Sequence, residues 1–313
     1  MLYVTVGWHS GELMVQERAG EAVIARRNGS AISGNVMVGA RPFLRLQPMI
    51  VLSSSDEESA LWASIIFGRP GFLASDDGSS LDIDLNRALV DPGDPVWANI
   101  RREKRLGSLV IELASRRRIR INGAARLDEN LHLRIDVEES FPACPKYITR
   151  RHVQLVSSET PPADGAPTLD TEPTQARFAT LANADTMFVA TRSDEGGYDV
   201  SHRGGFPGFL KVIGPLTIQW PEYPGNSMFN TLGNLVHNPE AGLAIPDFER
   251  GRVLQLTGRA VTLWDQSDPA NITAGTHRLV EMTVSRWQEL PLPSDLRTEL
   301  LDYSPFNPPV VAT

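Results

Sequence analysis

The chain has 313 residues, of which 41% are hydrophobic and 22% are charged, with a net charge of −8 and a pI of about 5.3. This composition is typical of a globular protein of up to two domains, and the acidic balance argues against nucleic acid as the main partner. The single cysteine, Cys144, excludes an internal disulfide. Because the sequence has no bilayer-length apolar run and residues 1–10 do not resemble a signal peptide, we expect a cytoplasmic protein with no membrane partner.

In chain order, residues 11–27 have apolar side chains at helical spacing, which predicts one or two surface helices. His9 and Glu12 are then expected to be the solvated cap and first turn of this segment. From residue 43 onward, short apolar or alternating runs separated by turns predict many strands, with one helix at residues 96–105. This pattern favours a small β-barrel.

Residues 157–174 contain four prolines and almost no large apolar residue, which predicts a linker. The strand pattern then begins again, with a helix expected at residues 228–237. The predicted organisation is a helical arm, a first barrel, the linker, a second barrel and an extension over the surface or a partner chain. The corresponding residues are 1–40, 41–156, 157–174, 175–290 and 291–313.

The two halves of the chain can be aligned with each other. Residues 63–72 match residues 200–209 without a gap, so that Ser64 falls on Ser201, and residues 120–124 match residues 255–259. Two matches at nearly equal separation predict a duplicated β-barrel. Residues 202–205 are His-Arg-Gly-Gly, whereas the first copy has Ile-Ile-Phe-Gly at this position. Apolar side chains cannot bind an anion, so we expect one full ligand site in each chain.

Residues 201–205 are expected to form a turn that combines a hydroxyl, an imidazole, a guanidinium and two glycines. Such a turn can direct donors at a phosphate or a flavin; the alternative is a glycine-rich hairpin with a solvated arginine. The basic run at residues 116–118 is expected to be a solvated hairpin, with a phosphate role as the less favoured alternative. Trp62, Trp220 and Tyr223 could stack on a ring, but packing is favoured for each. His152, His237 and His277 lack metal-ligand spacing, and no metal is expected.

Most of the chain, residues 8–287, resembles the two-barrel members of the pyridoxamine 5′-phosphate oxidase-related, FMN-binding split-barrel family. The second half carries Asp-Val-Ser-His-Arg-Gly-Gly at residues 199–205, Gly-Asn-Ser-Met-Phe-Asn-Thr-Leu-Gly-Asn at 225–234, His-Asn-Pro at 237–239 and Leu-Gln-Leu-Thr-Gly-Arg at 254–259. The first half carries Phe-Pro-Ala-Cys-Pro-Lys-Tyr-Ile at 141–148, and Trp-His-Ser-Gly-Glu at 8–12 is similar to the family's N-terminal arm.

The resemblance implies a mainly β protein with a few helices, built as tandem FMN-binding split β-barrels. It places FMN between two barrels, either within one chain as a pseudo-dimer or between two chains of a homodimer. The residues that it suggests for binding the cofactor are Ser201, His202, Arg203, Gly204, Asn226, Asn230, Thr231, Asn234, Lys146 and Cys144.

Arg203 is the first choice for the phosphate, because guanidinium matches phosphate oxygens; the alternative for Arg203 is a surface salt bridge. Asn230 and Thr231 stand at a helix start where the oxidase has basic and hydroxyl residues, which weakens that half of the phosphate site. Lys146 is expected at the phosphate or at the flavin N1–C2=O edge, and Cys144 is expected to line the pocket rather than to act as a nucleophile.

The activity implied is that of an FMN-dependent oxidoreductase with an unidentified small-molecule electron donor and acceptor. No catalytic side chain is identified. The alternatives are a non-catalytic flavin carrier or sensor, and a split-barrel protein that uses haem or deazaflavin.

Overall fold

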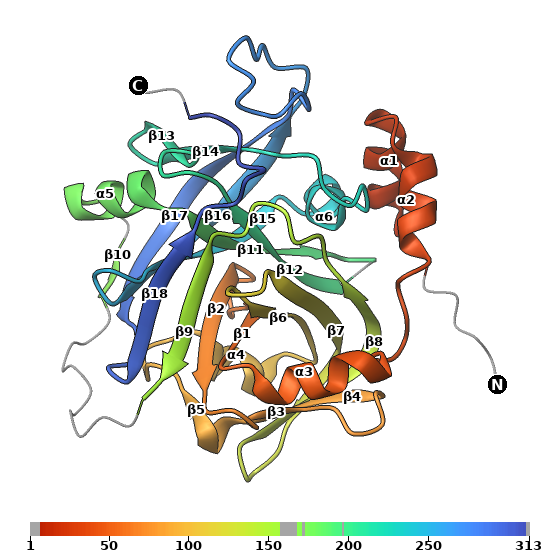
Figure 1. Ribbon diagram of the computed structural model, residues 1–313, viewed down its shortest axis with the longest axis vertical. Coiled ribbons are helices and arrows are strands. Elements are labelled where there is room, and N and C mark those ends of the chain that lie inside the picture. The colour runs from red at the N-terminus through yellow and green to blue at the C-terminus, as the bar shows by residue number, and fades with distance from the viewer. Residues whose placement is uncertain (1–6, 157–167, 171–172, 196, 311–313) are drawn as a thin grey trace.

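The computed structural model describes residues 7–156, 168–170, 173–195 and 197–310. Two large β-sheets make up most of it, and short helices lie around their margins (Figure 1). The predicted linker at residues 157–174 falls mainly outside the described residues. Within the described ranges, no helix has both the length and the apolar character needed to cross a bilayer.

The first half of the chain forms the arm and the first sheet. Its elements are α1 (Ser10–Arg18), α2 (Ala22–Gly29), η1 (Val38–Ala40), α3 (Arg41–Leu46), β1 (Met49–Ser55), β2 (Leu61–Gly68), β3 (Leu73–Ala74), β4 (Ser80–Asp84), η2 (Leu85–Arg87), β5 (Ala88–Leu89), α4 (Val96–Arg102), β6 (Arg105–Glu112), β7 (Arg117–Leu127), β8 (His132–Pro142) and β9 (Arg150–Leu155).

The second half forms the second sheet and the C-terminal segment. Its elements are β10 (Thr168–Asp170), α5 (Gln175–Asn183), β11 (Thr186–Ser193), β12 (Gly197–Gly204), β13 (Lys211–Gly214), β14 (Thr217–Pro221), α6 (Asn230–His237), β15 (Glu240–Asp247), β16 (Arg252–Leu263), β17 (Leu279–Pro291) and β18 (Leu296–Asp302).

The strand orders confirm the predicted duplication. One sheet runs β3-β4-β8-β7-β6-β1-β2, with β5 added at its edge, and the other runs β13-β14-β17-β16-β15-β11-β12. Each strand of the first sheet except β5 therefore has a counterpart at the same place in the second, and both sheets are antiparallel. The chain thus folds as tandem split barrels.

Local backbone features repeat as well. The matched turns at residues 70–72 and 207–209 both place a glycine at positive φ, Gly71 at +91° and Gly208 at +92°, where a side chain would be strained. The longest hairpin of each barrel carries a β-bulge at the matched position, before Gly123 and before Gly258. A bulge increases local twist and so helps a sheet to curl.

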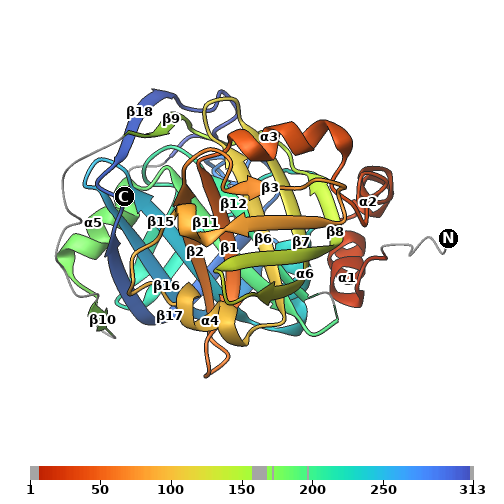
Figure 2. The ribbon, with the colours of Figure 1, turned by 90° about the horizontal axis from the view of Figure 1, so that it is seen from below.

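Each barrel has its own apolar core, and a third apolar cluster joins the two barrels. Strands β1 and β2 are buried on both faces, because one face lines a barrel and the other packs against the second sheet. Figure 2 shows these central strands, with α1 and α2 at one end. The members of the joining cluster are Met49, Val51, Ala63, Ile65, Phe67, Leu109, Ile111, Leu113, Ile148, Phe188, Ala190, Val200, Ala244, Val253, Leu290 and Leu292.

The joining surface has approximate two-fold symmetry. A Cβ atom on Gly107 would lie 2.7 Å from the backbone nitrogen of Asp199, and a Cβ on Gly242 would lie 2.8 Å from the Cα of Trp62. Residues 62 and 199 are equivalent in the internal repeat, and β6 is the counterpart of β15. Each barrel therefore has a glycine where an equivalent strand of the other barrel packs closely against it: Gly107 lies against β12, and Gly242 lies against β2. Both contacts are made within one chain.

Two local predictions need correction. Residues 201–204 lie in strand β12 rather than in a turn, which follows at residues 205–209. His9 is the N-cap of α1 and Glu12 lies in its first turn, but neither is solvated, because α1 packs against α6. The C-terminal segment was expected over the surface or on a partner chain, and its strand β18 is partly exposed and pairs with β9 of this chain (Figure 1).

Candidate functional site

A pocket lies where the two barrels meet, at the predicted binding motif. Its cavity volume is about 80 Å³, smaller than the roughly 300–1,000 Å³ of most small-molecule sites, so a ligand of that class would extend beyond it. Larger hollows occur elsewhere on the chain, but this one gathers charged and aromatic side chains from both barrels. Its lining residues are Arg118, Arg120, Ala143, Cys144, Lys146, Tyr147, His202, Arg203, Gly204, Glu222, Tyr223, Gly225 and Asn226.

The first barrel contributes two elements to the pocket. Arg118 and Arg120 are two residues apart on β7, so they project from the same face of the strand. The loop after β8 brings Cys144, Lys146 and Tyr147, and the carbonyl of Cys144 accepts a hydrogen bond of 2.8 Å from Nε of Arg118. This bond holds the loop against β7, so this wall of the pocket is formed by contacts within the protein itself.

The second barrel contributes β12 and the segment after β14. Tyr223 stacks at a tilt on Tyr147, with ring centroids 4.7 Å apart, and the Tyr147 hydroxyl donates to the carbonyl of Pro224 at 3.0 Å. A Cβ on Gly204 would lie within contact distance of the Tyr147 carbonyl. The two barrels are therefore closely fitted at the pocket, and the backbone of each lies against the other.

The cations of the pocket differ in how far they are neutralised. Arg203 is bound by Glu222 through two hydrogen bonds, of 2.9 and 3.0 Å. Arg118 contacts only the carbonyls of Cys144 and His202, and Lys146 lies over the Phe306 ring. Among the described residues, neither Arg118 nor Lys146 has an ion pair with a carboxylate. Burial and the charge of Arg120 lower the pKa of Arg118 to about 9, so it stays charged at neutral pH without a counter-ion.

His202 is a buried imidazole on the pocket wall and is only 3% exposed. Its ring packs edge-on against Phe188, and neither ring nitrogen has a hydrogen-bond partner among the described residues. Burial, with the nearby charges of Arg118 and Arg203, holds its pKa well below the usual value. His202 is thus a neutral group with unused hydrogen-bonding capacity, and unpaired buried groups of this kind are costly unless a ligand satisfies them.

Arg120 lines the pocket and is also the centre of a buried polar network. It pairs with Asp199 at 3.2 Å, donates to Asn230 at 2.8 Å and also contacts the Ser201 hydroxyl. Ser201 in turn is 2.7 Å from the Thr231 hydroxyl. These contacts connect β7, β12 and α6, while Nε of Arg120 has no hydrogen-bond partner among the described residues.

Two carboxyl groups extend this network toward the N-terminal arm. Glu12 accepts a hydrogen bond of 2.6 Å from Asn230, and Glu139 accepts one of 2.7 Å from Asn122. Burial, reinforced by Glu139, raises the pKa of Glu12 to about 8. Burial also raises the pKa of Glu139 to about 7. Protonation of these groups therefore favours the folded state.

We expect the free energy of unfolding to fall as the pH rises from about 5 to about 8. The folded-state pKa of Glu12 lies above its value of 4.5 in the unfolded chain, so its contribution is complete below pH 4.5 and is lost as the pH passes 8. Glu12→Gln should flatten this dependence by about 1–3 kcal/mol. Urea unfolding across this pH range measures it, with Glu17→Gln on the exposed side of α1 as the control. Equal slopes in wild type and Glu12→Gln would contradict the assignment.

The equivalent position at the other end of the pseudo-two-fold interface cannot bind an anion. In the repeat, Arg118 corresponds to Val253, His202 to Ile65 and Arg120 to Gln255. Val253 and Ile65 are buried in the apolar cluster that joins the barrels. Gln255 donates to the Ala63 carbonyl at 2.9 Å and to Asp94 at 3.1 Å. The duplicated interface therefore has cations at one end, whereas the residues matched to Arg118, Arg120 and His202 at the other end are uncharged.

The structure brings six of the ten predicted binding residues to the pocket. These are Cys144, Lys146, His202, Arg203, Gly204 and Asn226. The other four do not line it: Ser201, Asn230 and Thr231 belong to the network around Arg120, and Asn234 donates to the Thr191 hydroxyl at 3.0 Å.

Sequence reasoning underrated Arg118 and did not propose Arg120, Tyr147 or Glu222. The expectation that residues 116–118 are solvated is wrong for Arg118, which lines the pocket, and for Arg116, whose side chain is 20% exposed and pairs with Asp302, whereas Arg117 is exposed. The alternation of Arg118 and Arg120 within a strand, just before the Cys144 loop, was the signal that could have identified both.

No family model and no curated protein matches the chain. Parts of it are similar to solved structures of single-barrel length. HupZ of Group A Streptococcus is 18% identical (39% of this chain, 96% of that chain, TM-score 0.30). A putative pyridoxamine 5′-phosphate oxidase of Lactobacillus delbrueckii is 15% identical (38% and 94%, TM-score 0.30). The FAD binding protein of Mycobacterium smegmatis is 12% identical (42% and 100%, TM-score 0.27). These values are too low to support an activity, so the case for a function rests on the residues of this chain.

Proposed function

We propose that this protein binds FMN in the pocket between its barrels and acts as a flavin-dependent oxidoreductase. The observation that carries the proposal is the meeting of Arg118 and Lys146 of one barrel with His202 of the other. Two cations there lack a carboxylate partner, and the imidazole lacks any hydrogen bond among the described residues. An anionic, polar ligand would supply what all three lack.

The donor set fits the parts of FMN. Arg118 and Lys146 would bind the phosphate dianion, for which charge-assisted hydrogen bonds are the strongest available. His202 would offer a neutral hydrogen bond to the polar chain or the ring edge, and the paired rings of Tyr147 and Tyr223 would provide flat apolar surface. When bound, FMN supplies the hydride or electron transfer, while the protein binds and orients it.

We expect purified protein to take up FMN and Arg118→Met to bind it about 10- to 100-fold more weakly. A hydrogen bond to a charged group contributes about 1.5–3 kcal/mol, which corresponds to that range. Flavin fluorescence titration measures the affinity. Arg117→Met is the matched control, because Arg117 is the adjacent arginine and is exposed outside the pocket.

Riboflavin, which lacks the phosphate, separates a phosphate contact from general damage. Wild type should prefer FMN to riboflavin, and Arg118→Met should lose this preference while binding riboflavin unchanged. Arg203→Ala should have a smaller effect, since Glu222 already neutralises that charge. Protein that binds neither flavin would overturn the proposal, and an unchanged preference in Arg118→Met would remove Arg118 from the phosphate site.

The FMN-loaded protein mixed with NADH or NADPH without oxygen tests for oxidoreductase activity. Bleaching of the flavin, followed by turnover with an added acceptor, supports an enzyme. Stable FMN binding without reduction of the flavin by NADH or NADPH favours a carrier or sensor.

A further inference from the structure

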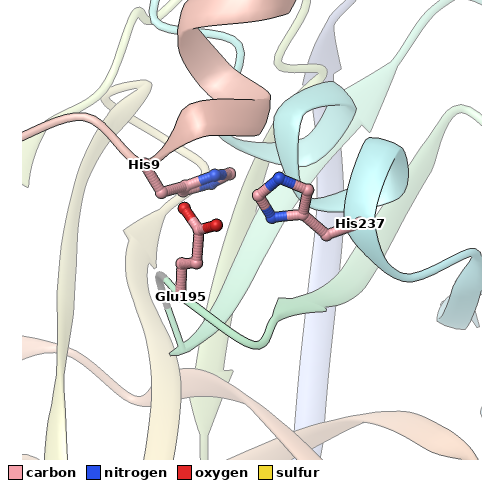
Figure 3. A group of neighbouring side chains, drawn as sticks. All are labelled: His9, Glu195 and His237. Atoms are coloured by element: carbon pink, nitrogen blue, oxygen red, sulfur yellow. The ribbon is translucent and has the colours of Figure 1, made fainter.

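A second polar cluster lies at the end of α6, whereas Arg120 contacts Asn230 at the start of that helix. His9, Glu195 and His237 come from the start of α1, the turn between β11 and β12, and the end of α6. Their side chains point toward one another (Figure 3). The imidazole centroids are 5.2 Å apart, and one donor atom from each residue lies within 4.8 Å of the others.

His237 is held so that one nitrogen faces this cluster. Its Nδ1 lies 2.9 Å from the Ser193 hydroxyl, and its Nε2 lies 2.8 Å from the Ser10 hydroxyl, on the side of Glu195. Histidines that bind metals are usually fixed through the ring nitrogen that does not bind. Ser193 provides that support and leaves Nε2 as the nitrogen available for a metal.

His9 is a largely buried part of the cluster. Its side chain is 8% exposed, it forms a capping box with Glu12 at the start of α1, and its Nε2 lies 3.6 Å from a carboxyl oxygen of Glu12. An imidazole binds a metal through an unprotonated ring nitrogen, so a metal on Nε2 of His9 would replace its present contact with Glu12.

We propose that His9, Glu195 and His237 bind a divalent first-row transition metal ion such as Zn²⁺. Two imidazoles and one carboxylate are a common ligand set for such ions. Glu195 is exposed, so water can complete the coordination. The ion would join the N-terminal arm to the second barrel at two separate points.

Only a small rearrangement is needed to form the site. Donor atoms around tetrahedral Zn²⁺ lie about 3.3 Å apart, given Zn–N bonds of about 2.0 Å, against the present limit of 4.8 Å. The Ser10 hydroxyl, which now contacts both Glu195 and His237, would turn away or become a fourth ligand. The Glu195 side chain is exposed, and moving it would break the hydrogen bonds that it accepts from the backbone nitrogen and the hydroxyl of Ser10, at 3.0 and 3.1 Å.

The helices that carry the two histidines are held rigidly. Gly11 and Gly233 meet where α1 crosses α6, and a Cβ on Gly233 would lie 2.7 Å from the Cα of Glu12. This close crossing sets the spacing of His9 and His237 independently of any ion. The two imidazoles are thus pre-positioned, which lowers the cost of binding a metal.

Equilibrium dialysis of the untagged full chain against Zn²⁺, with Co²⁺ absorption as a second probe, tests the site. We expect one ion per chain and a higher Tm when Zn²⁺ is added. His237→Ala and Glu195→Gln should each weaken binding roughly tenfold or more and remove the Tm increase. His277→Ala, which alters a histidine outside the cluster, should bind as wild type does.

Glu195→Gln guards against a folding artefact, because Glu195 is exposed and glutamine keeps its shape. Wild type without stoichiometric Zn²⁺ binding would overturn the proposal. So would Zn²⁺ binding that survives both ligand substitutions, or that His277→Ala reduces equally. None of these measurements depends on flavin, so the outcome is independent of the FMN proposal.

Discussion

Arg120→Met should destabilise the protein by about 3–5 kcal/mol, because it leaves a buried carboxylate without its partner. Arg120 is 6% exposed and Asp199 is 4% exposed, and the two are paired at 3.2 Å. The substitution also removes the hydrogen bond to Asn230, so β7 would lose its connection to α6. Urea unfolding at pH 7 measures the change in the free energy of unfolding.

Arg126→Met is the matched control for this prediction. Arg126 lies on the same strand and pairs with Asp136 at 3.0 Å, but its side chain is 66% exposed. An exposed pair of this kind contributes about 0–1 kcal/mol. Adding Asp199→Asn to Arg120→Met should recover part of the loss, because the uncompensated charge is then absent. Equal effects of Arg120→Met and Arg126→Met would show that burial does not govern the pair.

Gly242→Ala should have the second large effect, since it forces the barrels apart. The added Cβ would lie 2.7 Å from the carbonyl carbon of Leu61 and 2.8 Å from the Cα of Trp62. Both are backbone atoms of β2, which is buried on both faces and cannot move alone. Overpacking a buried contact costs about 1–3 kcal/mol, and we expect the upper end of that range in urea unfolding.

Gly39→Ala provides the comparison for Gly242→Ala. A Cβ on Gly39 would meet nothing within 4 Å, so its effect should stay within about 0.5 kcal/mol. Because the pocket has walls from both barrels, Gly242→Ala should also weaken FMN binding, whereas Gly39→Ala should not. A Gly242→Ala protein as stable as wild type would mean that the barrels are not packed as closely as described.

Much of the fold could be predicted from the sequence, because its signals are local. Alternating apolar residues identify strands such as β4, and the matched segments around Ser64 and Ser201 identify the duplication. The turn predicted at residues 201–204 was wrong, because glycines next to Arg203 resemble a turn locally. Pairing of β12 with β11 along its whole length outweighs that preference.

The site was only partly predictable, because the sequence shows local motifs but not contacts between distant residues. The motif residues His202 and Arg203 and the loop residue Lys146 are recognisable from the sequence, and the structure brings them to one pocket. Which cation lacks a counter-ion depends on contacts with residues far away in the chain. Glu222 neutralises Arg203, whereas Arg118 meets only carbonyl oxygens.

The sequence by itself determined the strand-rich class, the repeat and the asymmetry between its copies, because these depend on residue types and their local spacing. The tertiary structure decided that the two barrels of one chain pack on each other through matched glycines. It also decided that Arg118 is the unneutralised cation, and that His9, Glu195 and His237 meet. These depend on contacts between residues separated by tens to hundreds of positions, which only the folded chain brings within a few ångströms of one another.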